Sequence, residues 1–134
     1  SKMPGKSYSL PAWECKTGAK LVKIPGSVCA GCYALKGNYT RYPAIKRAQY
    51  VRLKALASPL WVQAMAVQVK SQKYFRWHDA GDLQSSDHLK KIFEVCKLTP
   101  ETKHWMPKFN YQDELTYDKS RTRKAMALDV YSYE

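Results

Sequence analysis

Three of the four cysteines lie in the first 32 residues, at spacings that suit a shared metal ion. Cys29 and Cys32 form a Cys-x-x-Cys pair around Gly31, and thirteen residues separate Cys15 from Cys29. Two thiols three positions apart in a glycine-containing loop can both turn toward one ion, and Cys15 can add a third if the chain between them folds back. We therefore predict that Cys15, Cys29 and Cys32 form one metal centre.

The cysteine pattern leaves the kind of centre open. A tetrahedral zinc site needs a fourth ligand, for which the sequence offers His78, His88, His104 or Cys96. Three cysteines without a fourth suit an iron–sulfur cluster with one open iron. A disulfide is the competing explanation, but no secretion signal indicates an oxidising compartment. A thioredoxin-like pair normally follows a strand and has no third cysteine. We expect Cys96 to be a core residue, because it lies on the apolar stripe of a predicted helix.

A second polar group follows an aromatic run at 74–77. His78, Asp79, Gly81 and Asp82 lie within five residues, and the pattern predicts a turn there. An imidazole and two carboxylates can bind an amine, coordinate a metal or shuttle a proton, and Gly81 would let the backbone approach a ligand closely. Asp and Gly are also common in ordinary turns, where Asp82 could accept hydrogen bonds from amides of the next helix.

The elements that must position these residues alternate between strand and helix patterns. We expect a loop at 1–19, strands at 20–24, 74–77 and 102–106, the cysteine loop at 27–38, and helices at 40–57, 59–70, 86–97 and 119–128. Thr40 should cap the first helix, and Ser85 or Ser86 the third. Strands separated by helices indicate right-handed β-α-β units, so we predict an α/β fold with a parallel sheet.

Two helices are expected to pack in particular ways. The helix at 59–70 is apolar on most sides and should be buried. In the helix at 86–97 we expect one buried face, which follows helical spacing and consists of Leu89, Ile92, Phe93 and Cys96. Ligands bind at the carboxyl ends of parallel strands. The cysteine loop after the first strand and the turn at 78–82 should therefore meet at one rim of the sheet.

Length and composition suit a single domain of 134 residues with 45% apolar residues and no low-complexity tract. The longest mainly apolar stretch, 60–69, is too short to cross a bilayer. Residues 1–11 do not look like a signal peptide. We expect a cytoplasmic protein without a membrane partner. Gly-x-Ser-x-Gly, phosphate-loop and His-Glu-x-x-His motifs are absent, which argues against the classical hydrolases.

Positive charge is concentrated in the N-terminal half. Residues 1–73 hold thirteen Lys and Arg against Glu14 alone, whereas the remaining 61 residues hold ten of each sign. Such a field favours nucleic acid or another polyanion, although it could also be a solvated basic face. Candidate contacts in and next to the helix predicted at 40–57 are Arg41, Lys46, Arg47, Arg52 and Lys54.

Taken together, three motifs resemble the phage gene-product-88 family, which is similar in layout to radical S-adenosylmethionine proteins. The resemblance covers about residues 1–107 and leaves 108–134 as an unassigned tail of the same domain. It is carried by Cys-Ala-Gly-Cys-Tyr-Ala at 29–34, Phe-Arg-Trp-His-Asp-Ala-Gly-Asp at 75–82 and His-Trp-Met-Pro at 104–107.

This resemblance implies a truncated (β/α) half-barrel in which Cys15, Cys29 and Cys32 hold a [4Fe–4S] cluster. The open iron would bind the amino and carboxylate groups of S-adenosylmethionine. Tyr33 would pack beside the cluster, and Asp82 or Asp79 would hold the methionine amino group. The usual radical motif is Cys-x-x-x-Cys-x-x-Cys, so the first gap here is longer.

Three functions are compatible with these observations. The first is a radical-S-adenosylmethionine-like iron–sulfur protein that acts on or binds nucleic acid or nucleotide, in the host cytoplasm if it is encoded by a phage. The alternative is a zinc-stabilised basic module that binds nucleic acid without catalysis. The third is an interaction protein in which the cysteines are structural or unliganded, for example a phage protein that inhibits a host nucleic-acid enzyme.

Overall fold

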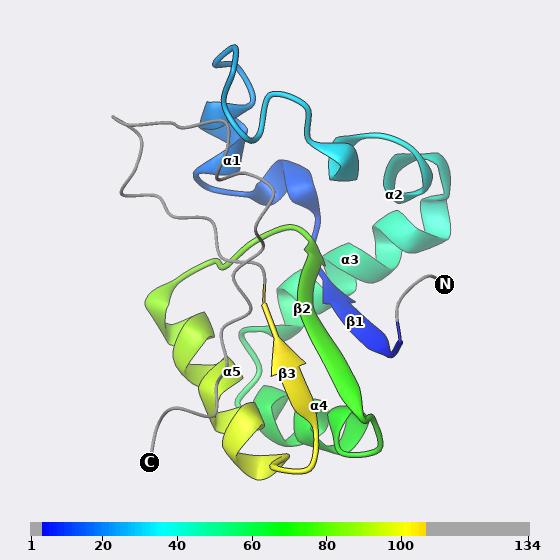
Figure 1. The fold of residues 1–134 in the computed structure, drawn as a ribbon, viewed down its shortest axis with the longest axis vertical. Helices are drawn as coiled ribbons and strands as arrows, with labels where there is room; N and C mark the ends of the chain where they lie inside the picture. Colours follow the sequence, from blue (N-terminus) through cyan, green and yellow to red (C-terminus); the bar gives the residue numbers. More distant parts are fainter. Residues whose placement is uncertain (1–3, 107–134) are drawn as a thin grey trace.

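A three-stranded parallel sheet forms the centre of the computed structural model, which describes residues 4–106. Its strands are β1 (Lys6–Ser9), β2 (Tyr74–Ala80) and β3 (Lys103–Trp105), in the order β1-β2-β3 (Figure 1). Lys6 pairs with Phe75, and Tyr74 pairs with Lys103. The predicted α/β class with a parallel sheet is confirmed.

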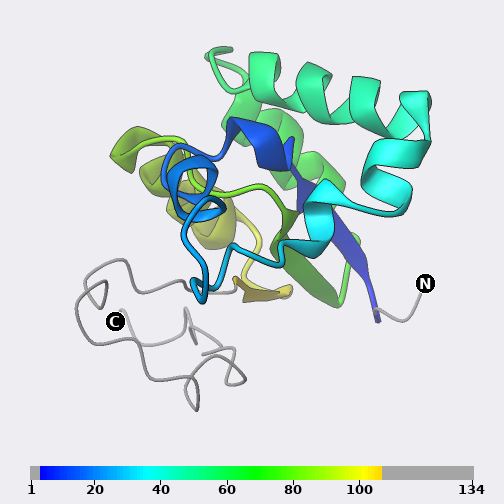
Figure 2. The ribbon, with the colours of Figure 1, turned by 90° about the horizontal axis from the view of Figure 1, so that it is seen from above.

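Helical segments surround the sheet unequally. The helices α3, α4 and α5 lie on one side of it, whereas α1 and the chain up to α2 lie beyond the carboxyl ends of the strands (Figures 1 and 2). The helical segments are η1 (Ala12–Glu14), α1 (Gly18–Leu21), η2 (Tyr33–Leu35), α2 (Asn38–Arg41), α3 (Pro43–Ala55), α4 (Trp61–Val69) and α5 (Ser86–Leu98). No helix within residues 4–106 is long and apolar enough to span a membrane.

Local sequence explains where the helices start. Ser85 caps α5, because its side chain accepts a hydrogen bond from the amide of His88 at 3.1 Å. Pro43 occupies the first turn of α3, where its missing N–H costs nothing. The prediction that Thr40 caps this helix is wrong. Tyr42 is the N-cap and is held extended by the following proline, so Thr40 falls in the separate short helix α2.

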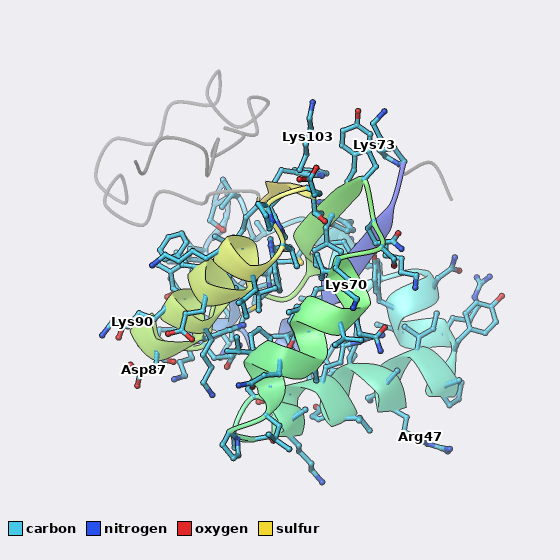
Figure 3. All side chains as sticks on the ribbon, turned by 90° about the horizontal axis from the view of Figure 1, so that it is seen from below. Arg47, Lys70, Lys73, Asp87, Lys90 and Lys103 are labelled. Carbon is cyan, nitrogen blue, oxygen red and sulfur yellow. The ribbon has the colours of Figure 1, made fainter. Side chains whose placement is uncertain are left out.

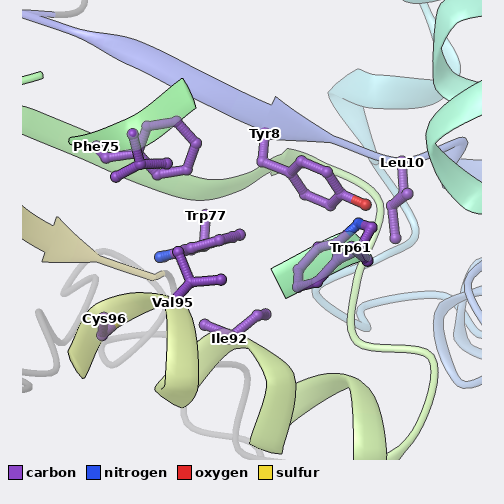
Figure 4. Close-up of a cluster of buried hydrophobic side chains, with 9 residues drawn as sticks. Tyr8, Leu10, Trp61, Phe75, Trp77, Ile92, Val95 and Cys96 are labelled. Carbon is purple, nitrogen blue, oxygen red and sulfur yellow. The ribbon is translucent and has the colours of Figure 1, made fainter. Parts of the chain in front are cut away.

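The core lies between the sheet and its helices. Phe75 and Trp77 of β2 point to this side, with ring centroids 4.9 Å apart, and Trp77 is 1% exposed. Cys96 belongs to the core, as predicted. The buried cluster consists of Tyr8, Leu10, Trp61, Val69, Phe75, Trp77, Ile92, Val95 and Cys96 (Figure 4).

The prediction of a strand at 20–24 is wrong. This segment begins inside α1 and continues as turns, and it pairs with no strand of the sheet β1-β2-β3. The first strand is instead β1, in the segment expected to be a loop. Its four residues alternate only weakly between polar and apolar, but Tyr8 and the following residues are buried.

Two packing predictions also need correction. Helix α4 is not buried on most sides, since Val67 is 61% exposed and only its Trp61 and Val69 are buried. Ala64 and Val67 therefore face solvent, whereas Val62 and Met65 pack against the core. The buried face of α5 is turned from the predicted one, because Phe93 is 39% exposed. The buried residues of α5 are His88, Ile92, Val95 and Cys96. The helix predicted at 119–128 and the tail at 108–134 lie outside the described residues.

Candidate cofactor site

Three cysteines from separate turns line one cavity beyond the carboxyl ends of the strands. Cys15 follows η1, Cys29 lies in the turns after α1, and Cys32 directly precedes η2. All three are free thiols of intermediate exposure. Their cavity has a volume of about 150 Å³, and its other walls are mainly apolar: Ala12, Trp13, Gly18, Ala19, Val22 and Leu35.

Gly18 permits this close approach. A Cβ atom at this position would lie 3.1 Å from Cys15 Cβ, 3.6 Å from Cys29 Sγ and 3.8 Å from Cys15 Sγ. A side chain at residue 18 would crowd Cys15, so glycine lets the first turn of α1 pack closely against two of the thiols. Our sequence interpretation missed Gly18, although its position three residues after Cys15 was a usable signal.

The thiols share a cavity but do not form a closed site. Within residues 4–106, no group of three or more His, Cys, Asp or Glu side chains is arranged so that it could hold a metal ion as it stands. The cysteines would have to turn toward one another to share an ion. Coupling between metal binding and local folding is common, because a site is seldom complete without its metal.

The electrostatics of the cavity connect the cysteines to Asp82. Burial, and after it the negative charges of Asp82, Cys32 and Cys29, raise the pKa of Cys15 to about 12. Burial, Cys32 and Asp82 likewise raise the pKa of Cys29. Burial also raises the pKa of Asp82, against the effect of the amide of Leu83, which donates to its Oδ1 at 2.7 Å. These groups would repel one another if they ionised together, and a cation between them would relieve that repulsion.

A bulge in β2 determines which side chains face the site. Ser7 pairs with Arg76 and Ser9 with Ala80, so one residue of β1 stands opposite three residues of β2. His78 in the middle has a φ of 55°, a left-handed conformation that is unusual for a non-glycine residue. Bulges re-aim side chains and are frequent next to functional sites. The predicted turn therefore starts later than expected, since His78 and Asp79 still belong to the strand.

Asp79 ties the cysteine segment to the sheet. Its Oδ2 accepts hydrogen bonds from Ser7 Oγ at 2.9 Å and Tyr39 OH at 3.2 Å, and Tyr33 OH donates to its backbone carbonyl. Because Tyr33 follows Cys32 directly, this contact fixes the second half of the cysteine loop above β2. Oδ1 of Asp79 is buried and has no hydrogen-bond partner. On the same strand, the Arg76 guanidinium lies 4.6 Å from the ring centroid of Trp105.

His78 points away from the cysteines, into the core on the helix side. Its ring packs 5.3 Å from that of His88 and 5.7 Å from that of Tyr8, between centroids. Both of its ring nitrogens are buried without a partner. Burial, and secondarily the neighbouring His88, lowers the pKa of His78 to about 3.

None of the side chains considered as a fourth zinc ligand lines the cysteine cavity. His78 and His88 belong to the core on the helix side. His104 Nδ1 accepts from Trp77 Nε1 at 3.2 Å, and Cys96 is buried in the main core. Among the charged groups, Asp82 has the largest effect on the pKa of Cys15.

The basic residues predicted to contact a polyanion divide into two groups. Arg52 is turned inward, where its guanidinium donates to the carbonyl of Ser9 at 3.2 Å and to Ser9 Oγ at 3.0 Å. It joins α3 to β1. The other four, Arg41, Lys46, Arg47 and Lys54, are exposed.

Comparison with known protein families gives a match. A family model described as gene product 88 matches residues 1–112, which includes both cysteine segments and the Asp79–Asp82 region. The searches of curated proteins and of solved structures found no match. The chain belongs to the gene-product-88 family of phage proteins.

Proposed function

We propose that this protein is a radical-S-adenosylmethionine-like iron–sulfur protein that acts on or binds nucleic acid or nucleotide. Cys15, Cys29 and Cys32 would hold a [4Fe–4S] cluster, and its open iron would take S-adenosylmethionine. When bound, this pair supplies one-electron chemistry that generates a radical from the sulfonium cofactor. The observation that carries the proposal is the single cavity shared by the three cysteines beside Asp82.

The donor set and its surroundings fit such a cluster. Three free thiols would leave one iron of the cluster without a protein ligand, and S-adenosylmethionine would bind to that iron. The remaining walls are apolar side chains such as Val22 and Leu35, and an apolar shell limits the access of solvent to a redox centre. Gly18 leaves space beside Cys15 and Cys29 that any other residue would fill.

Asp82 is the better candidate for the methionine amino group. Its carboxylate acts on the pKa of both Cys15 and Cys29, so it lies near the position where the amino group would be held. Asp79 already accepts hydrogen bonds from Ser7 and Tyr39, and its role is to hold the cysteine segment on the sheet. A carboxylate forms a strong charge-assisted hydrogen bond with an ammonium group.

The placement of the helices supports a half-barrel relationship. Helices α3 to α5 lie on one side of the parallel sheet (Figure 2), and the polar side chains of Ser7, Asp79 and Arg76 belong to the other side. In (β/α) barrels the helices form the outer layer, and the active site lies at the carboxyl ends of the strands. The cysteine cavity occupies the corresponding end here (Figure 1).

A zinc-stabilised basic module is the rival function, and the structure offers it less support. Structural zinc sites are closed by four ligands, and none of the four side chains weighed for the last position lines the cavity. Asp82 would have to complete the set. The proposal is therefore tested by the identity of the metal.

The test is anaerobic purification, reconstitution with iron and sulfide, elemental analysis and an ultraviolet–visible spectrum. We expect about four irons and four sulfides per chain, with broad absorption near 400 nm, as for a cluster of this type. Replacement of Cys15, Cys29 or Cys32 by Ala should abolish the absorption. Cys96→Ala is the matched control, because Cys96 is a core cysteine outside the cavity. One zinc per chain without a chromophore would refute the proposal.

Binding of S-adenosylmethionine is tested separately by equilibrium dialysis of the reconstituted protein. Asp82→Asn should weaken binding about ten-fold or more, because the amide keeps the shape but loses the charge that pairs with the ammonium group. Asp87→Asn, on the exposed first turn of α5, should leave the affinity unchanged. Equal affinities of the Asp82→Asn variant and the wild-type protein would remove Asp82 from this role.

A further inference from the structure

Helices α2 and α3 carry five cations and no acidic residue. Because Arg52 is turned inward, four exposed cations remain. We call these four the basic ridge: Arg41, Lys46, Arg47 and Lys54. Arg47 and Lys54 are seven residues apart on α3, so they lie on the same side of the helix, about 10 Å apart along its axis.

The basic ridge differs in charge from α5. Helix α5 mixes signs, with Asp87 and Glu94 among its lysines, and Lys90 forms an exposed ion pair with Asp87 at 4.0 Å. Arg47 projects from α3 on the opposite side of the molecule from Asp87 and Lys90 (Figure 3). A surface of one sign attracts a chain of the opposite sign, and its effect on association is strongest where no acid interrupts it.

Trp13 joins the basic ridge to the cysteine cavity. The Lys46 ammonium lies over the Trp13 ring, 4.9 Å from its centroid. The indole Nε1 of Trp13 donates to Tyr50 OH, which in turn donates to Glu14 at 3.1 Å. Trp13 is also a wall of the cavity that contains Cys15, Cys29 and Cys32. One aromatic ring, fixed in place by α3, therefore stands between the cations and the candidate cofactor site.

We propose that the basic ridge and Trp13 bind single-stranded nucleic acid, with the phosphates on the basic ridge and a base stacked at Trp13 next to the cysteine cavity. The placement of a base at this cavity rests on the proposed function, because a cofactor there needs a substrate atom within reach. Alternating cations and aromatic rings are the usual means of holding a single strand, since every base has a face that can stack.

A single strand is preferred over a duplex for a physical reason. In a duplex both faces of each base are already stacked, so a base could reach Trp13 only after unpairing and extrusion. A single strand presents its bases without that cost. Tyr42, 50% exposed beside Arg41 at the start of α3, offers a second ring along the same path.

The experiment is fluorescence anisotropy of the full chain with a labelled 20-nucleotide oligo(dT) and a labelled 20-base-pair duplex, over a series of salt concentrations. We expect the single strand to bind at least ten-fold more tightly than the duplex. The double substitution Arg47→Gln and Lys54→Gln should reduce the slope of log affinity against log salt by about 1.4, because each phosphate contact to a single strand contributes about 0.7. Lys90→Gln with Lys97→Gln, on α5, is the matched control and should leave the slope unchanged.

Trp13 is tested by two substitutions. Trp13→Ala should weaken oligo(dT) binding roughly five-fold or more, the lower end of the range for the loss of one stacked base. Trp13→Phe should retain most of the affinity, because phenylalanine keeps a ring that can stack. Equal affinity for duplex and single strand, an equal loss in the α5 control, or no effect of Trp13→Ala would each overturn the proposal.

The iron content of the same preparations separates this proposal from the proposed function. Ridge variants should load iron like the wild-type protein, whereas a Cys15, Cys29 and Cys32 triple variant should lose iron and still bind oligo(dT). Single-strand binding through the basic ridge in a protein that takes up zinc and no iron would refute the proposed function and leave the strand-binding surface standing. A protein that binds a full cluster but shows no preference for the single strand would refute the strand-binding proposal and leave the proposed function standing.

Discussion

Gly81→Ala should be among the most destabilising single substitutions next to the candidate site. Gly81 has a φ of 75°, and it connects the end of β2 to Asp82. A Cβ atom there would lie 2.6 Å from the carbonyl oxygen of Leu10 and 2.7 Å from its Cβ. The Leu10 backbone cannot move aside easily, because its amide donates to the carbonyl of Ala80 at 2.9 Å.

Two contributions set the size of the effect. A left-handed conformation costs an ordinary residue about 1–2 kcal/mol, of which the lower entropy of the unfolded chain returns about 0.4–1 kcal/mol. The clash with Leu10 adds about 1–3 kcal/mol, as for other overpacked positions. We expect the free energy of unfolding to fall by about 1–5 kcal/mol.

Gly26→Ala isolates the first contribution. Gly26 also has a positive φ, 85°, and a Cβ atom at this position would meet nothing within 4 Å. Urea unfolding followed by circular dichroism should show a loss of about 1 kcal/mol or less for this control. A Gly81→Ala variant no less stable than Gly26→Ala would refute the argument that the approach of Leu10 requires glycine.

Three further predictions concern the core, a helix cap and the cavity. Burial lowers the pKa of His78 to about 3 and that of His88 to about 4. Below the pKa of about 6.5 that a histidine has in the unfolded chain, the unfolded state binds protons that the folded state does not. The free energy of unfolding is therefore highest above pH 6.5 and falls as the pH is lowered toward 4. The free energy of unfolding measured with urea at pH 7.5 and at pH 5 should differ by on the order of 4 kcal/mol, about 2 kcal/mol from each histidine, and a His88→Gln variant should show about half of this difference. Ser85→Ala removes the cap of α5 and should cost about 1 kcal/mol in the same assay; no loss would show that the bond to the His88 amide is not needed. Gly18→Ala should lower the iron content of reconstituted protein, since the new Cβ crowds Cys15 at 3.1 Å, and undiminished iron would contradict that account of the cavity.

The sequence was most informative where several local signals agreed. Ser85 before an amphipathic run defined α5, and the aromatic residues at 74–77 defined β2, because a capping residue and a continuous apolar run each leave little choice. The exact buried face of α5 could not be predicted. His88 is buried there against Tyr8, Trp61 and His78, contacts between residues far apart in the sequence.

The first strand was missed because its stability comes from its neighbour. Lys6–Ser9 has only one large apolar residue, and a period of two cannot be recognised from so few positions. Pairing with β2 on one side supplies its hydrogen bonds, and Tyr8 packs on Trp61 and Trp77. The segment at 20–24 has a better strand pattern in isolation but no partner in the sheet, and tertiary contacts outweigh weak propensities.

The prediction that the cysteine loop and the Asp79–Asp82 region meet depended on the parallel topology of the sheet more than on the predicted strand at 20–24. A parallel sheet places the carboxyl ends of all its strands at one rim, so the segment that follows any first strand reaches the rim where β2 ends. Because β1 replaces 20–24, the chain enters the cysteine region directly from this rim, and Cys15 is only six residues beyond Ser9. What the topology could not supply is the bulge at His78, which sends His78 into the core and leaves Asp79 to bind Ser7 and Tyr39. The left-handed residue in β2 therefore explains why Asp79 holds the cysteine segment, whereas Asp82, beyond the end of the strand, acts on the pKa of Cys15 and Cys29.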